Sequence, residues 1–158
     1  MPYANWVTAI VCNALGRYEE ALSAALQATE YMPELFVSTW AVPDLIEAAA
    51  RVGNTNVARG ALERLSETAQ AGGTDHGLGL EARSRAVLSE GEAADRLYRE
   101  AVDRLGRTRL HPELARAHLL FGEWLRRKRR RSDARAQLRT AYETLPLTSG
   151  TYVRLREI

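Results

Sequence analysis

Lysine is almost absent from this chain of 158 residues, and cysteine and β-branched aliphatic residues are scarce. The chain has one lysine, one cysteine (Cys12), and only 12 valines and isoleucines together. A single cysteine excludes an intramolecular disulfide and suits a reducing compartment, where we expect it to be a small buried residue. The shortage of β-branched residues argues against a β-sandwich or a βαβ enzyme fold.

Long apolar runs are also missing. No stretch approaches the roughly 18 consecutive apolar residues that a membrane-spanning helix needs. The N-terminal segment MPYANWVTAIVCNALGRYEE lacks the basic region of a signal peptide. We therefore expect a cytoplasmic protein without a membrane segment.

The residues that are abundant favour helices. The chain has 25 alanines and 21 leucines, and both types rank high in helix propensity. Glycine or a capping residue separates the apolar-rich segments, and Pro43 should either delay or kink the third one. The sequence predicts an all-α protein with helices over residues 3–15, 18–32, 36–52, 55–70, 76–89, 92–105, 112–128 and 132–145.

A repeat underlies these segments. One small residue opens the second helix of each of the four predicted hairpins, and these four residues are 37, 36 and 40 positions apart. The residue seven positions after each of them is also small in three of the four hairpins. Small residues two turns apart mark a helix face where two backbones approach closely. Repeats of two helices predict an α-solenoid. The two sets are Ala21, Ala58, Ala94 and Ala134, and then Ala28, Leu65, Ala101 and Ala141.

The first unit resembles a tetratricopeptide repeat in its second half. The family's glycine, aromatic, small, small and proline positions are occupied by Gly16, Tyr18, Ala21, Ala28 and Pro33. In the fourth unit, Gly122 recovers the small residue of the first helix. The expected fold is an α-solenoid of about four antiparallel helical hairpins over residues 1–145, with 146–158 as a C-terminal tail or capping segment.

A longer resemblance concerns the chain as a whole. Runs such as GRYEEAL, LIEAAARVGN, ALERLSET and ELARAHLLFGEWLRRKRRRSDAR are similar to the helical-repeat segment of large LuxR-type transcriptional regulators. The similarity covers residues 3–143 and is densest over 81–143. The chain departs from the family after Glu143 and has no GxxxxGK[ST] phosphate-binding motif. The resemblance implies the regulator's repeat module, without its ATPase and helix-turn-helix domains.

Catalytic motifs are missing from the sequence. It contains no HExxH, paired CxxC, GxSxG or GxGxxG. His111 and His118 are seven residues apart, but no second cluster completes a metal site. We expect a protein that is not an enzyme and that needs no cofactor or metal.

The most conspicuous charged feature is a basic run that extends to Arg135 and Arg139. Residues 1–80 carry 4 basic and 9 acidic groups, whereas 81–158 carry 18 and 11. Because the run spans a predicted turn, its charges should fan out, and no aromatic residue is interleaved for base stacking. This argues against direct nucleic-acid binding and favours a solvated turn, with docking on an acidic protein surface or on a neighbouring DNA-binding domain as the alternative. The run is Arg126, Arg127, Lys128, Arg129, Arg130 and Arg131.

The concave groove of the predicted solenoid is the candidate binding site. The first helix of each hairpin should present one stripe of residues, spaced by three or four, to this groove. The stripes place aromatic residues beside polar ones, as in sites for peptides and small ligands, although Trp6 and Trp40 could equally be core residues between hairpins. The candidate groove residues are Tyr3, Trp6, Asn13, Trp40, Glu47, His76, Arg83, Arg116 and Glu123.

These observations and the LuxR resemblance together predict a non-catalytic regulatory or protein-interaction module. Its groove would bind a protein partner, a peptide or a small-molecule effector, and association with further copies of the chain stays open. The alternative is a stand-alone scaffold or adaptor with no role in transcription.

Overall fold

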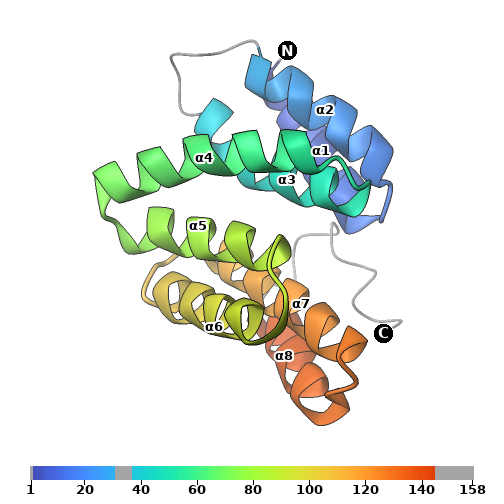
Figure 1. Ribbon diagram of the computed structural model, residues 1–158, viewed down its shortest axis with the longest axis vertical. Helices are drawn as coiled ribbons and strands as arrows, with labels where there is room; N and C mark the ends of the chain where they lie inside the picture. The colour runs from blue at the N-terminus through green and yellow to red at the C-terminus, as the bar shows by residue number, and fades with distance from the viewer. Residues whose placement is uncertain (1, 31–36, 145–158) are drawn as a thin grey trace. The chain divides into compact units, whose positions relative to one another are not determined.

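The computed structural model describes residues 2–30 and 37–144, and all of the regular structure in these ranges is helical (Figure 1). The all-α prediction is therefore confirmed for this part of the chain. The helix bounds differ from the expected ones by a few residues. Pro33 and the predicted tail, residues 146–158, lie outside the described residues. The helices are α1 (Pro2–Ala14), α2 (Tyr18–Glu30), α3 (Val37–Arg51), α4 (Thr55–Gly72), α5 (Asp75–Val87), α6 (Gly91–Gly106), α7 (His111–Arg127) and α8 (Arg131–Thr144).

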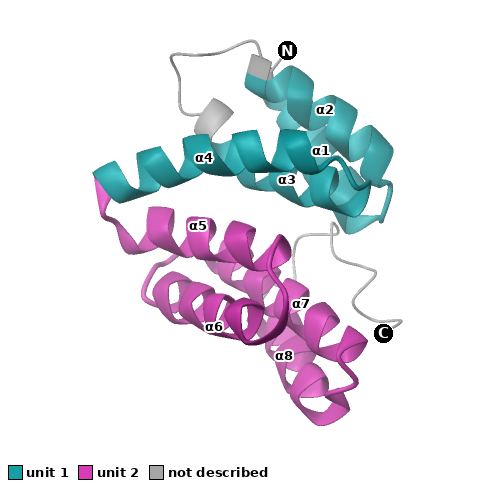
Figure 2. Cartoon of the chain, viewed as in Figure 1, with its two compact units in different colours: residues 1–71 teal, residues 72–158 magenta. Residues whose placement is uncertain are grey.

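The chain divides into two compact units, residues 1–71 and 72–158 (Figure 2). In the first unit, α1 packs on α2 and α3, and α2 also packs on α3. In the second unit, α5 packs on α6, α6 packs on α7, and α7 packs on α8. No helix within the described ranges is both long and apolar enough to cross a membrane.

Three of the helix–helix turns share one geometry. Gly16, Gly53 and Arg129 each have a left-handed backbone, with φ of 72°, 80° and 61°. After each of them, an N–H bonds back to a carbonyl five residues earlier, over 2.8 to 3.0 Å, which is the Schellman ending of a helix. Glycine adopts this conformation without steric strain, whereas arginine does not. The α7–α8 turn therefore has this geometry with an unfavourable residue in it.

The two sets of repeated residues, which the sequence pattern placed at close helix contacts, are buried. Ala21, Ala58 and Ala94 are fully buried, and Ala134 is 3% exposed. The residues seven positions later are equally inaccessible, with 4% exposure at the largest of them, Leu65. The structure thus confirms the burial expected at all eight positions.

Two glycines of the second unit lie where neighbouring helices approach closely. A Cβ atom at Gly122 of α7 would lie 2.7 Å from Cγ of Leu138 on α8 and 3.3 Å from the carbonyl oxygen of Ala134. A Cβ atom at Gly79 of α5 would lie 2.8 Å from Cγ of Leu105 on α6. A side chain at either position would force the facing leucine to shift, so glycine suits this close approach of the backbones. Gly122, which occupies the small position of the tetratricopeptide resemblance, lies at the contact of α7 with α8.

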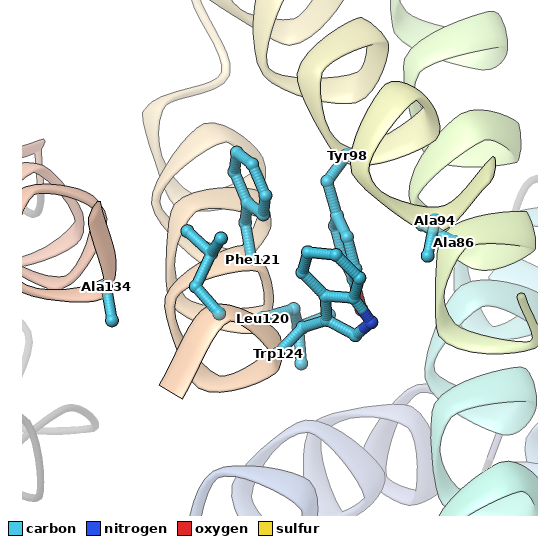
Figure 3. Packing of buried hydrophobic residues seen from close by; sticks show 8 residues of the cluster. Ala86, Ala94, Tyr98, Leu120, Phe121, Trp124 and Ala134 are labelled. Atoms are coloured by element: carbon cyan, nitrogen blue, oxygen red, sulfur yellow. The ribbon is translucent and has the colours of Figure 1, made fainter. Parts of the chain in front are cut away.

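An aromatic cluster holds the core of the second unit (Figure 3). The ring of Tyr98 on α6 stacks on Phe121 of α7, with centroids 5.3 Å apart, and Trp124 lies 5.9 Å from Tyr98. All three side chains are at most 6% exposed. Trp124, the third tryptophan of the chain, therefore stabilises α6 against α7.

A cluster of small residues forms part of the core of the first unit. Cys12, Ala21 and Ala48 meet at the contacts of α1, α2 and α3, and Cys12 is 5% exposed, as expected for a structural thiol. Helix α3 begins at Val37 and continues through Pro43. The late start, one of the two effects expected of Pro43, is therefore excluded, and the kink stays a prediction.

Candidate functional site

The first unit carries a group of three aromatic rings, two exposed and one half-buried, which we call the aromatic face: Tyr3 and Trp6 of α1, and Trp40 of α3. Trp6 lies between the other two rings, and each pair of centroids is 5.6 Å apart with the planes 75° apart. These are edge-to-face contacts, which aromatic pairs prefer. Tyr3 is 63% exposed and Trp40 is 49% exposed. Large rings therefore lie at the surface of this unit.

A hydrogen bond from α1 to α3 orients the central ring. Nε1 of Trp6 donates to Oδ2 of Asp44 over 3.1 Å. Nδ2 of Asn13, two turns further along α1, donates to the backbone oxygen of Asp44 over 3.0 Å. Asp44 thus receives one bond through its side chain and one through its backbone. Asp44 was not among the predicted groove residues, although it lies one helical turn after Trp40 on the same side of α3.

Three other predicted groove residues are buried. Asn13 is 3% exposed, and Glu47 and Arg83 are each 4% exposed. Arg83 of α5 donates through Nη1 to Oε2 of Glu113 on α7 over 2.7 Å. Burying a charged group is favourable only when it is paired in this way. Asn13 and Arg83 therefore tie helices together within their units.

The remaining predicted groove residues are half-buried members of the second unit. His76 is on α5, and Arg116 and Glu123 are on α7. Arg116 and Glu123 already interact with other residues of the chain. Of the nine predicted groove residues, the structure brings Tyr3, Trp6 and Trp40 into one contiguous exposed group.

The basic run spans the end of α7, the turn and the start of α8, as predicted. Two of its members make ion pairs with the start of α6. Nζ of Lys128 lies 2.9 Å from Glu90, and Nη1 of Arg130 lies 2.5 Å from Asp95. Arg130 also contacts Asp133 of α8 at 2.7 Å. Glu90 and Asp95 were not predicted as partners of the basic run, because they lie 38 and 35 residues before Lys128 and Arg130.

Two arginines lower the pKa of the Asp95 side chain. Desolvation on burial acts to raise the pKa of this carboxyl, but hydrogen bonds from Arg99 and Arg130 outweigh it and hold the pKa below its usual value. The pKa of Glu90 is also lowered, mainly by the hydrogen bond from Lys128. Both carboxylates are therefore ionised at neutral pH and stabilise the α7–α8 turn against α6.

The histidines do not assemble a metal site in the described part of the chain. Nδ1 of His118 on α7 makes a 2.7 Å hydrogen bond with Oε1 of Gln137 on α8, and His118 is largely buried. His111 is exposed at the first position of α7. No group of three histidine, cysteine, aspartate or glutamate side chains within residues 2–30 and 37–144 is placed to bind an ion.

Two open hollows accompany these features, one in each unit. The hollow in the first unit has a volume of about 420 Å³ and lies where Arg51 of α3 covers the ring of Tyr18 at 5.6 Å. The hollow in the second unit, about 540 Å³, lies between α6 and Trp124, and charged groups surround its mainly apolar surface. The residues that line this second hollow are Gly91, Glu92, Asp95, Arg96, Arg99, Trp124 and Arg130.

Comparison of the chain with models of protein families, with curated proteins and with solved structures gave no match.

Proposed function

We propose that this protein is a non-catalytic interaction module, similar to the helical-repeat region of LuxR-type regulators, that binds a protein or peptide through its aromatic face. The observation that carries the proposal is the exposure of Tyr3 and Trp40 on either side of Trp6. Exposed tryptophan and tyrosine side chains are the residues that most often dominate the binding energy of an interface.

The geometry of this face suits an apolar or aromatic side chain of a partner. The hydrogen bond to Asp44 holds Trp6 in one orientation, so little side-chain freedom is lost when a partner binds. Val7 of α1 is 43% exposed and adds aliphatic surface one residue beyond Trp6. We expect the partner to insert a hydrophobic residue beside Trp6, with polar contacts at the edge of the face.

Site-directed photocrosslinking in the source cells tests this proposal. A benzoylphenylalanine side chain replaces Trp40 in one variant and Leu26 in a control. Leu26 is 39% exposed on α2, so both positions are accessible in the same unit. We expect a discrete crosslinked species from position 40 that is missing from position 26. Identical crosslinked species at both positions, or none at position 40, would contradict the proposal.

The second candidate function is a stand-alone scaffold or adaptor with no role in transcription. It uses the same aromatic face, so binding alone does not separate the two functions. The LuxR resemblance implies that the module senses a ligand or partner and passes that state to other domains by a shift between conformations. A helix-turn-helix domain encoded downstream in the same reading frame would favour the regulator, and its absence there would favour the scaffold.

A further inference from the structure

The basic run and its extension along α8 contain two groups of cations that differ in their partners. Lys128 and Arg130 are held by Glu90, Asp95 and Asp133, so their charges are already neutralised. The other group continues along α8 beyond the turn. The members of this second group are exposed, whereas Ala134 and Ala141 on another side of the helix are buried.

Three arginines form a stripe on α8, which we call the α8 stripe: Arg131, Arg135 and Arg139. They are spaced by four residues, so they lie on one face with a rise of about 6 Å from each to the next. All three are exposed, and within the described residues none of them forms an ion pair. The stripe therefore presents three free guanidinium groups in a row.

The carboxylates of α8 do not neutralise this stripe. Asp133 bonds to Arg130 on another side of the helix. Glu143 lies one turn after Arg139 near the helix end, and no ion pair joins these two among the residues described here. Like charges at a spacing of four residues repel each other in a helix. An anionic partner that contacts the stripe would relieve this repulsion.

An aromatic residue lies on the same face. Tyr142 follows Arg135 by seven residues and Arg139 by three, and it is 49% exposed. An exposed ring beside a row of cations is the arrangement by which proteins bind single-stranded nucleic acid, with phosphates on the cations and a base stacked on the ring. A carboxylate-bearing protein surface would use the arginines but would not need a stacking ring.

We propose that the α8 stripe, together with Tyr142, binds the phosphate backbone of a single-stranded nucleic acid without sequence preference. The sequence argued against nucleic-acid binding because the charges of the basic run fan out around a turn and no aromatic residue lies among them. Neither reason applies to α8. The arginines of α8 share one face, and Tyr142 supplies the aromatic ring. The unit formed by residues 72–158 contains 18 basic and 12 acidic groups, so its net charge of +6 also attracts a polyanion.

The test is a fluorescence-anisotropy titration of the full chain against an end-labelled, mixed-sequence DNA strand of about 20 nucleotides. Three phosphate contacts predict that the affinity falls about 20-fold between about 50 and about 200 mM salt. The double variant Arg135→Gln/Arg139→Gln keeps one contact, so its affinity should fall only about 3-fold over the same range. Wild-type protein that does not bind at the lower salt concentration would overturn the proposal.

A second double variant controls for net charge. Arg96→Gln/Arg109→Gln removes the same two charges from exposed positions of the same unit. This control should keep the wild-type affinity and salt dependence. If both double variants lose affinity equally, binding reflects overall charge only, and the proposal of a site on α8 is overturned.

Substitution of the ring separates nucleic acid from an acidic protein surface. Tyr142→Ala should weaken single-strand binding about 10-fold, Tyr142→Phe should retain it, and binding to duplex DNA should not respond to either change. Unlabelled polyglutamate serves as a competitor. If polyglutamate displaces the labelled strand as efficiently as unlabelled DNA does, the site is one for acidic proteins and the proposal is wrong.

Discussion

Trp6 and Asp44 connect α1 to α3 at the aromatic face: the indole Nε1 of Trp6 donates a 3.1 Å hydrogen bond to Oδ2 of Asp44. The bond fixes the central ring of the three, and the rings of Tyr3 and Trp40 then pack on its two sides. A carboxylate on one helix thus determines the shape of an exposed surface to which both helices contribute.

Removing this carboxylate should disorder the aromatic face. Asp44→Ala leaves the indole N–H without its partner and should lower the free energy of unfolding by about 1 kcal/mol. The near-ultraviolet circular dichroism of the tryptophans should decrease as well. Asp44→Asn is the matched control, because its amide oxygen still accepts the bond. Equal spectra and equal stability for the two variants would show that the bond does not orient Trp6.

Alanine in place of Gly122 should destabilise the protein, although alanine favours a helix. The new Cβ atom would meet Leu138 and the Ala134 carbonyl, and overpacking of this kind costs about 1–3 kcal/mol, more than the gain of about 1 kcal/mol in helix propensity. Gly60→Ala in α4 is the control, since nothing lies within 4 Å of its Cβ position. Urea unfolding should show a loss for Gly122→Ala and a gain for Gly60→Ala. Stabilisation by both substitutions would contradict the close approach of α7 and α8.

Glycine in place of Arg129 should stabilise the α7–α8 turn. Arg129 has a φ of 61°, a conformation that costs a residue with a side chain about 1–2 kcal/mol and costs glycine almost nothing. Arg135→Gly changes the charge equally but lies inside a helix, so it should lose about 1 kcal/mol. Thermal unfolding should therefore shift upward for the first variant and downward for the second. A lower melting temperature for Arg129→Gly would contradict the turn geometry.

Stability should depend on pH through Asp95. Because its folded-state pKa is lowered, the carboxylate contributes stability that is present above its unfolded-state pKa, near 4, and is lost as the pH falls through the lower folded-state value. Asp95→Asn should lower the free energy of unfolding at pH 7 by about 1 kcal/mol and should flatten its decline below pH 4. The measurement is urea unfolding at a series of pH values, with Asp103→Asn as the control. If the free energy of unfolding of Asp95→Asn declined below pH 4 as steeply as that of the wild type, the predicted role of the ion pairs with Arg99 and Arg130 would be excluded.

Local signals predicted the helices well, because glycine and capping residues mark their ends and the alanine stripes mark their packed faces. Pro43 was harder to interpret, since its effect depends on whether the preceding turn can do without one hydrogen bond. The third tryptophan shows a different limit. Trp124 packs on Tyr98, 26 residues earlier in the chain, and no local pattern indicates that contact.

The candidate site was predicted only in part, for a physical reason. A helical stripe gives the face on which a residue lies, but burial depends on the neighbouring helix. Asn13 and Arg83 fall on the predicted stripes, and the structure buries them in hydrogen bonds to Asp44 and Glu113. Tyr3 and Trp40 fall on equivalent stripes and remain exposed. Whether a stripe residue is buried therefore depends on partners far away in the sequence, and the spacing of residues along one helix does not reveal these partners.

The most direct test of the proposed function is the affinity of the partner captured at position 40 for the folded Trp6→Ala/Trp40→Ala variant, measured by isothermal titration. Loss of aromatic residues at the centre of an interface commonly costs 2 kcal/mol or more, so we expect an affinity at least about 30-fold weaker than that of the wild-type protein. Leu26→Ala should bind as the wild type does. A folded double variant with unchanged affinity would contradict the assignment of the aromatic face as the binding site.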